Sequence, residues 1–508
     1  MWNKVAIAIL LAILSTGCPQ RLERKVGPTL QTVDMEAPYL KCHMKNGELY
    51  VLSGWRIDEA TKSIAGTGEL HGTDRRIESR GSYRVAFADV ALYETNTIVT
   101  SPAVAGLAVI AGLSAIVTTA CIVEPKNCFG SCPTFYAPDD LGGRPVLQAE
   151  GFSDAIAPAL ESNDIDALWR TTGRPGPFTL TMTNEAYETH VVKAADLLAV
   201  PRPRGGRVLA DGTTLWSASR VTPPTSCSAA EGDCLASVRL VDTDERSSLT
   251  DENDLAARET IDLAFPAGAG SQQALVVGAR QSLVTTFLLY QGLAYLGTTA
   301  TSWLALLEGG DTASRKGGRE LQKLGTIEVQ IERDGAWQTV GTIYETGPIA
   351  TDVHLVMLPP GISGEHVRLT LPRGGWRIDS IALATITGKA APIRLAPKSM
   401  RGTISSHYNA GRTPATTFPI VTMPGDRYEL GYTLPKLPAS ADEYELFLDS
   451  RGYYLEWMRK EWLEEENPIA ALRMFITPEQ MLKELAPAYK KLEPKAEELF
   501  WRSRYAHP

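Results

Sequence analysis

Residues 324–343, LGTIEVQIERDGAWQTVGTI, decide the fold class. In this stretch Ile327, Val329 and Ile331 alternate with polar residues, which is the two-residue period of a β-strand that buries one face. Further strands are predicted at short intervals downstream, over residues 337–343, 354–358, 367–371 and 376–384. Antiparallel strands at this spacing predict a β-sandwich or a jelly roll over residues 318–390.

Strand patterns also dominate the chain on both sides of this segment. Residues 49–93 contain three strand-like segments bounded by turn residues, residues 178–198 alternate around Thr, Val and Leu, and residues 428–457 contain a further set. We therefore expect a mainly β protein with some α-helix, built from antiparallel sheets. A chain of 508 residues is long for one core and predicts about three domains.

The sandwich segment resembles the galactose-binding-like modules, which hold sugars or other ligands at a loop-rich edge. Trp337 and Trp376 are its candidate ligand-binding residues, because an exposed indole stacks on a sugar ring. The alternative is that both rings belong to the core, as is usual for tryptophan in a strand. Similarity of fold does not by itself establish binding.

Two uncharged segments interrupt the strands, at residues 103–123 and 282–307. Ser101 and Pro102 are typical of a helix start, and each segment is long enough to span a membrane. Small residues in the first segment, and Gln291 with several threonines in the second, favour helices buried inside the protein, the second one against a sheet. The alternative is an integral envelope component with two transmembrane helices.

The last residues, 461–508, predict helices. The sequence TPEQ at 477–480 has the form of a capping box with proline at the first helical position. Apolar residues then recur on one face of the helix: Met481, Leu485, Ala488 and Leu492. We expect this face to pack on the body of the protein and not on a partner.

The first residues have the form of a secretory signal, with Lys4, an apolar run at 5–14 and small residues before Cys18. The run is too short to span a bilayer. The sequence LSTGC at 14–18 resembles the lipobox of bacterial lipoproteins. This resemblance implies removal of residues 1–17, acyl chains such as palmitate on Cys18, and a place in the cell envelope. Because Pro19 stands where some lipoproteins carry an inner-membrane-retaining aspartate, we expect the outer membrane.

The six other cysteines predict up to three disulfides, because exported chains meet an oxidising compartment. Cys227 and Cys234 enclose a short polar stretch in which Gly232 can turn the chain, and we expect them to pair. Two further bridges are shared, with no preferred pairing, among Cys42, Cys121, Cys128 and Cys132. A zinc site is the alternative for the last three, but their spacing lacks the close cysteine pair typical of zinc ligands.

A second resemblance begins at Ser131-Cys132-Pro133. A group of large uncharacterised bacterial lipoproteins has a similar Ser-Cys-Pro element, followed by an aromatic residue and a Gly-rich turn. The resemblance continues through residues 177–200, the apolar segment near residue 285, and residues 324–343 and 375–384, and it covers roughly residues 130–455. It implies an architecture and a compartment, and no activity.

Composition and motifs narrow the function. The net charge is −9 and Lys and Arg form no cluster, so we expect no nucleic-acid partner. The sequence has no nucleophile elbow, zinc-binding HExxH helix, P-loop or Rossmann fingerprint, and its histidines are scattered. We therefore predict no cofactor, no metal site and no catalytic residue. Because glycan hydrolysis needs only two well-placed carboxylates, an envelope glycan or peptidoglycan hydrolase remains the alternative.

These patterns predict an exported, lipid-anchored binding or scaffold protein whose partner is a glycan or an envelope protein. Its expected parts follow in order along the chain: a signal peptide (1–17), a lipidated tether (18–38), a small antiparallel β domain (39–100), an apolar helix (101–126), a disulfide-bearing β domain (127–280), a second apolar helix (281–310), a β-sandwich (318–390), a β extension (391–460) and C-terminal helices (461–508).

Overall fold

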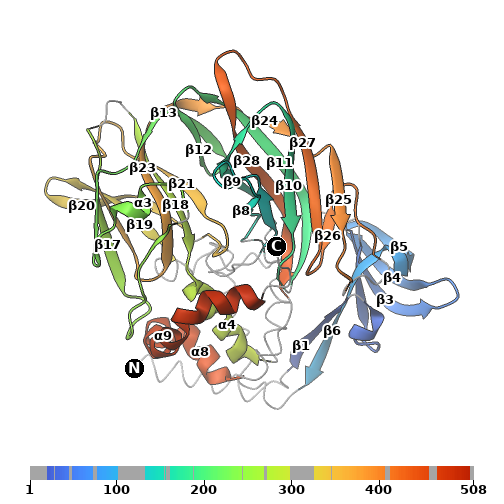
Figure 1. The fold of residues 1–508 in the computed structure, drawn as a ribbon. Coiled ribbons are helices and arrows are strands. Elements are labelled where there is room, and N and C mark those ends of the chain that lie inside the picture. Colours follow the sequence, from blue (N-terminus) through green and yellow to red (C-terminus); the bar gives the residue numbers. More distant parts are fainter. Residues whose placement is uncertain are drawn as a thin grey trace.

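The computed structural model describes residues 20–503, apart from 28, 45–47, 72–76, 101–131, 154, 156–160, 187, 243, 268–271, 298–324, 345, 407–411 and 457–465. Over these residues the protein is mainly β, as the strand patterns predict, with its longer helices gathered at one end of a stack of sheets (Figure 1). The signal segment, Cys18, Cys121, Cys128 and the apolar segment 103–123 lie outside the described residues.

Sheet A is formed by the N-terminal part of the chain and contains six antiparallel strands in the order β1-β6-β2-β3-β4-β5. Its strands are β1 (Gln20–Gly27), β2 (Tyr39–Met44), β3 (Leu49–Asp58), β4 (Ser63–His71), β5 (Ile77–Ala86) and β6 (Val90–Thr100). The strand β1 pairs with β6 along its whole length. The expectation of a tether is therefore wrong for residues 20–27, because β6 provides backbone hydrogen bonds that a polar sequence does not reveal.

The first sandwich consists of sheets B and C. Sheet B has the order β25-β27-β10-β7-β8, and sheet C has the order β24-β11-β28-β9 with β26 also on β11. The strands are β7 (Thr134–Ala137), β8 (Val146–Glu150), β9 (Ser162–Gly173), β10 (Gly176–Thr183), β11 (Glu188–Pro203), β24 (Ile393–Leu395), β25 (Ser399–Thr403), β26 (Ile420–Thr422), β27 (Arg427–Leu434) and β28 (Ala441–Glu456). Leu180 and Leu430 of sheet B meet Leu197 and Leu446 of sheet C in one core.

The second sandwich consists of sheets D and E. Sheet D has the order β12-β13-β23-β18-β21 with β16 also on β23, and sheet E has the order β15-β14-β17-β22-β19-β20. The strands are β12 (Arg207–Asp211), β13 (Thr214–Thr222), β14 (Ser226–Ala229), β15 (Gly232–Asp233), β16 (Arg246–Ser247), β17 (Arg258–Ala264), β18 (Gln273–Gln281), β19 (Ile327–Arg333), β20 (Ala336–Ile343), β21 (Asp352–Met357), β22 (His366–Pro372) and β23 (Trp376–Ala390). The alternating Ile327, Val329 and Ile331 all face the core, as the sequence predicts.

The two inner sheets, C and D, pack on each other and so bury both of their faces. Leu198 of sheet C and Val276 of sheet D share this middle core, while their neighbours Leu197 and Leu275 face the outer sheets. This explains why LLAV at 197–200 and ALVV at 274–277 are continuous apolar runs and not alternating ones. The resulting order of layers is B, C, D, E, which Figure 1 shows as a fan of sheets.

The chain builds the second sandwich between the two halves of the first. Strands β7–β11 start the first sandwich, β12–β23 form the second, and β24–β28 return to sheets B and C. The expected parts 127–280, 318–390 and 391–460 therefore divide the chain differently from its sheets. Sequence order misses this arrangement because antiparallel partners such as β10 and β27 lie far apart along the chain.

Three longer helices pack together: α4 (Leu283–Leu296), α8 (Pro468–Ile476) and α9 (Pro478–Ser503), whereas α3 (Leu235–Val238) is a single turn. The predicted apolar helix is confirmed over residues 283–296, and the rest of the segment, 298–307, lies outside the described residues. Within the described ranges the helix packs mainly against α8 and α9, and not against a sheet as expected. The helix α9 starts at Pro478, as the capping box predicts. Ala488 is exposed, and the buried face consists of Met481, Leu482, Leu485, Ala486, Tyr489 and Ala496. No helix within the described ranges has the length and apolar character needed to cross a membrane.

Candidate functional site

The two tryptophans predicted to bind ligand lie in different sheets. Trp376 begins β23 of sheet D, is 1% exposed, and donates its indole N–H to the carbonyl oxygen of Gly325 at 2.8 Å. A ligand-binding role for Trp376 is therefore wrong, because the ring fills the core between sheets D and E. Trp337 is half-buried on edge strand β20, where the guanidinium of Arg368 lies 4.3 Å from the ring centroid.

Arg368 is itself held in place, since it donates two hydrogen bonds to Asp262 at 2.6 and 2.9 Å. A ligand that stacked on this side of Trp337 would have to displace a paired arginine. Sugar binding by Trp337 stays a prediction, and the two tryptophans do not form one site.

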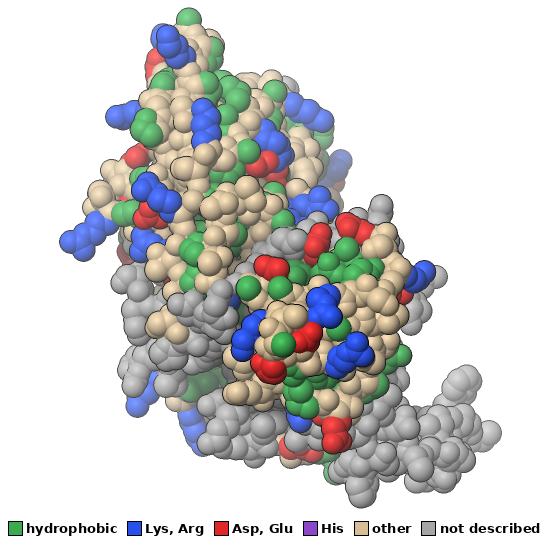
Figure 2. Space-filling view, turned by 90° about the vertical axis from the view of Figure 1, so that its right-hand side faces the viewer, with side chains coloured by type: hydrophobic (Ala, Val, Ile, Leu, Met, Phe, Trp, Pro, Cys, Tyr) green, Lys and Arg blue, Asp and Glu red, His purple; other side chains and the backbone are tan. Residues whose placement is uncertain are grey.

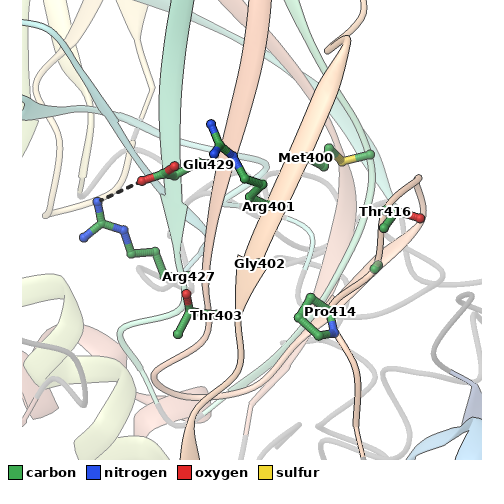
Figure 3. A pocket seen from close by; sticks show the side chains of 9 residues that line it. Met400, Arg401, Gly402, Thr403, Pro414, Thr416, Arg427 and Glu429 are labelled. Atoms are coloured by element: carbon green, nitrogen blue, oxygen red, sulfur yellow. Dashed lines mark ion pairs between the residues drawn. The ribbon is translucent and has the colours of Figure 1, made fainter.

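A pocket lies elsewhere, at the edge of sheet B, and has a volume of about 590 Å³. Four consecutive residues of β25, Met400 to Thr403, form one part of its lining, and residues 414–416 form another. Arg427 and Glu429 of the neighbouring strand β27 complete it (Figure 3). The lining therefore combines charged side chains with the apolar side chains of Met400, Pro414 and Ala415.

The loop that forms one wall of this pocket is fixed to the core behind it. Arg412 donates to the Asp426 carboxylate, and both side chains are at most 3% exposed. The backbone N–H of Ala415 donates to the hydroxyl of Tyr428 at 3.1 Å. Asp426 also accepts from the backbone N–H of Ser405 at 2.8 Å. The wall is thus held at several points, so the pocket is preformed.

Because Gly402 has no side chain, residues 414–416 can lie close to strand β25. A Cβ atom at this position would lie 2.5 Å from the ring of Tyr428 and 2.8 Å from the Cβ of Pro414. Because real side chains do not reach such distances, any larger residue would push the wall away from β25. The glycine therefore belongs to the construction of the pocket.

The charged side chains that line the pocket carry a net positive charge. Arg427 lies 3.9 Å from Glu429, whereas Arg401 makes no ion pair with any residue in the described part of the chain. Glu429 is the one carboxylate among the residues that line the pocket, so they do not offer the carboxylate pair of a glycan hydrolase.

Sequence reasoning missed this pocket, although the sequence contains a signal for it. Between Asp379 and Asp426 the chain has no acidic residue at all, in a protein of net charge −9. The same stretch carries five basic residues: Lys389, Arg394, Lys398, Arg401 and Arg412. In the structure Arg394 pairs with Asp196 and Asp449. Arg412 is buried against Asp426, and Lys389 lies in the second sandwich. Lys398 and Arg401 remain exposed beside the pocket, where positive charge without an ion pair in the described ranges attracts anions.

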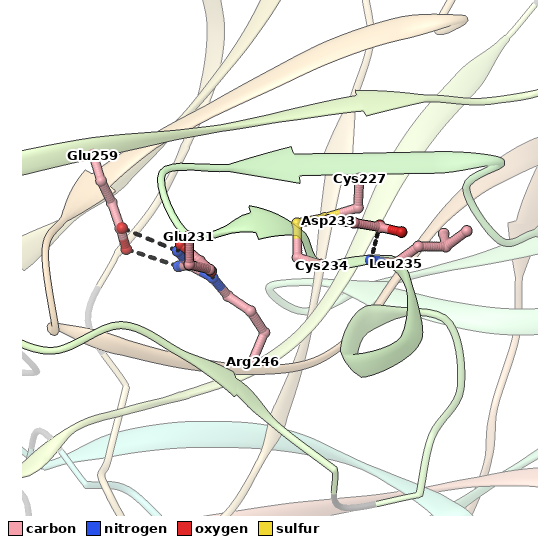
Figure 4. The surroundings of a disulfide bond; sticks show 7 residues. All are labelled: Cys227, Glu231, Asp233, Cys234, Leu235, Arg246 and Glu259. Carbon is pink, nitrogen blue, oxygen red and sulfur yellow. Dashed lines mark hydrogen bonds and ion pairs between the residues drawn. A yellow bond between two sulfur atoms is a disulfide. The ribbon is translucent and has the colours of Figure 1, made fainter.

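The predicted pair of cysteines forms a disulfide between β14 and α3. Cys227 and Cys234 have an S–S distance of 2.04 Å and a Cα–Cα distance of 5.1 Å, and both lie in the core of the second sandwich. Gly232 turns the chain between them with a φ of +112°, a conformation that favours glycine. Beside this loop Arg246 donates to Glu231 and Glu259 at 2.7 Å each (Figure 4). The prediction of this disulfide is confirmed.

Removing the disulfide with the C227A/C234A pair is expected to lower the free energy of unfolding by about 2 kcal/mol, since the crosslink closes only a short loop. Urea unfolding followed by circular dichroism measures the change. The wild type with its disulfide reduced should show a similar loss, and an unchanged midpoint in both would contradict the prediction.

Two other cysteines predicted to be bridged, Cys42 and Cys132, are thiols in the structure. Cys42 lies in the core of sheet A, where burial raises the pKa of its thiol to about 12. Cys132 precedes β7 and donates to the Glu150 carboxylate at 3.0 Å. The expectation of a bridge is wrong for both, because each thiol is enclosed in the interior of a different sheet system.

Glu150 connects the two sandwiches. It ends β8 of sheet B, and its Oε2 accepts the backbone N–H groups of Ile349 and Ala350, both at 2.9 Å, from the loop between β20 and β21. Burial raises the pKa of Glu150, and the hydrogen bonds from Cys132 and the two N–H groups oppose that shift. This carboxylate therefore fixes a loop of the second sandwich to the edge of the first.

Further carboxylates lie near Cys132 but are closed to solvent. After burial itself, Glu150, Glu188 and Asp166 raise the pKa of the Cys132 thiol well above its ordinary value. These three carboxylates are at most 7% exposed. A polymer such as a glycan cannot reach them in this conformation, so the group is part of the interior.

Metal ligands do not converge within the described ranges, where no group of three or more His, Cys, Asp or Glu residues is arranged to hold an ion. No protein-family model matches the chain, and no curated protein is significantly similar to it in sequence.

Proposed function

We propose that this chain is an exported, lipid-anchored protein of the cell envelope that acts by binding a partner. The form of the signal segment and the position of Cys18 support the anchor. The Cys227–Cys234 disulfide supports export, since such crosslinks persist in oxidising compartments. Pro19, in the place of a retaining aspartate, favours the outer membrane.

The single observation that carries the binding role is the preformed pocket on sheet B. Its wall is held by the buried Arg412–Asp426 pair and by the Ala415–Tyr428 hydrogen bond. A partner that binds a preformed surface does not have to order it, which improves affinity. The pocket lining contains no nucleophile and general base in contact, so it is better suited to recognition than to catalysis.

The position of strand β1 limits how far from the membrane a lipid on Cys18 could hold the protein. The strand β1 begins at Gln20, two residues after Cys18. Because an extended residue spans at most about 3.6 Å, a lipid on Cys18 would hold the first residue of sheet A within about 10 Å of the acylated sulfur. The protein would then lie directly on the membrane surface and not at the end of a long tether.

Labelling cells with an alkyne analogue of palmitate tests the proposed modification. We expect the wild type to incorporate the label, and mass spectrometry to find a mature N-terminal peptide that begins with acylated Cys18. The Cys18→Ala variant should incorporate none. A mature chain that begins elsewhere, or label that persists in the variant, would refute lipidation at this residue.

A further inference from the structure

We propose that the free edge of β25 binds an extended, acidic peptide segment of another envelope protein as an additional strand of sheet B. This inference rests on the proposed binding function and names its partner, but it does not depend on the lipid anchor.

The strand β25 is a terminal strand of its sheet. It pairs with β27 over Ser399–Thr403, and no further strand of the described residues pairs with its other edge. A terminal strand leaves a row of backbone N–H and C=O groups that a further strand can pair with. The pocket lies along this strand, since Met400 to Thr403 all line it. A peptide that extended the sheet would therefore occupy the pocket.

The two faces of such a peptide would meet different surroundings. Side chains of a strand point alternately to opposite faces. On one side of β25 lie Arg401, Arg427 and Glu429, and on the other lie Met400, Pro414 and Thr416 (Figure 3). We therefore expect the bound segment to alternate acidic and apolar residues.

The charge of this side of the molecule agrees with an acidic partner. Lys398 and Arg401 are exposed, and neither makes an ion pair with a residue in the described ranges. Figure 2 views the molecule from the side on which β25 lies, and there Lys and Arg side chains are spread over the upper part with few carboxylates among them. Opposite charges on two partners steer their association and set its specificity.

A peptide fits this pocket better than a glycan does. No aromatic side chain is among the residues that line it, so a sugar ring would find no flat apolar surface on which to stack. A strand edge, in contrast, binds peptides through the main chain and selects them through alternate side chains.

Fluorescence anisotropy with a labelled peptide of alternating valine and glutamate, eight residues long, tests the proposal on the full chain in detergent at low salt. We expect saturable binding, weakened about tenfold by Arg401→Glu. The matched control is Arg239→Glu, which changes an exposed arginine after α3 in the second sandwich and should leave binding unchanged. Circular dichroism shows whether both variants are folded.

Two further probes separate strand addition from simple attraction of anions. Methylation of alternate peptide nitrogens blocks backbone pairing and should abolish binding, while the charge stays the same. An acidic polysaccharide should bind at least tenfold more weakly than the peptide. Equal binding of either probe, or no binding of the original peptide, would overturn the inference. Palmitate labelling of Cys18 is unaffected by these results, so the two failures can be told apart.

Discussion

Asp426→Ala is expected to lower the free energy of unfolding by about 3–5 kcal/mol, because it removes one partner of a buried ion pair. The Asp426 carboxylate accepts from Arg412 and from the backbone N–H groups of Ser405 and Met423, the latter two at 2.8 and 2.9 Å. Without it, the guanidinium of Arg412 and the N–H of Met423 stay buried, and the N–H of Ser405 stays partly buried, each with one acceptor fewer. Urea unfolding measures the loss.

A matched control is Asp233→Ala, which removes an exposed aspartate that accepts the backbone N–H of Leu235 at 2.9 Å. We expect this variant to lose about 1 kcal/mol or less, because water replaces an exposed acceptor. The same two variants also test the pocket. Asp426→Ala should weaken binding of the valine–glutamate peptide and Asp233→Ala should not. A loss of stability no larger in Asp426→Ala than in the control would contradict the assigned role of the buried pair.

Glu150→Ala is expected to lower the free energy of unfolding by a similar amount, about 3–5 kcal/mol. The change leaves the N–H groups of Ile349 and Ala350 buried without their acceptor, at about 1–3 kcal/mol each. The variant Glu150→Gln keeps an acceptor oxygen and should lose about 1–2 kcal/mol. If the alanine and glutamine variants were equally stable, the hydrogen bonds of Glu150 would not hold the two sandwiches together.

The contribution of Glu150 to the free energy of unfolding should decrease as the pH rises. Because burial raises the pKa of Glu150 above its ordinary 4.5, the unfolded state ionises first as the pH rises. The free energy of unfolding of the wild type, relative to Glu150→Gln, should therefore be greatest below pH 4.5 and should fall as the pH rises above it. Unfolding of both proteins across this range measures the difference, and a constant difference would contradict the raised pKa.

The sequence predicts the features that depend on near neighbours. The alternation of Ile327, Val329 and Ile331 predicts a strand with one buried face, and all three residues lie in the core. The short loop between Cys227 and Cys234 predicts their disulfide. In both cases the residues that form the structural feature lie within a few positions of one another in the sequence.

Features that depend on distant parts of the chain were not predicted. The sequence predicts a tether where strand β1 lies, because the partner strand β6 comes several strands later along the chain. The contacts of Glu150 with Ile349 and Ala350 join residues about two hundred positions apart. The sequence makes Trp376 a candidate ligand residue because it does not reveal which face of β23 sheet E encloses.

The candidate site was missed for the same reason. Arg401, Arg427 and residues 414–416 come from two strands and a loop, and only the register of β25 on β27 brings them together. The acid-free stretch from 380 to 425 was visible in the sequence, but a charge pattern alone does not locate a pocket.

Membrane fractionation of the wild type beside Cys18→Ala, with an exported signal supplied to the variant and carbonate extraction of the membranes, tests whether acyl chains on Cys18 anchor the protein. We expect the wild type to remain in the extracted membrane, and the variant to be released as soluble, exported protein with its Cys227–Cys234 disulfide intact. If the variant stays in the membrane after extraction, Cys18 is not the sole anchor, and the proposal of a lipid-anchored binding protein is wrong.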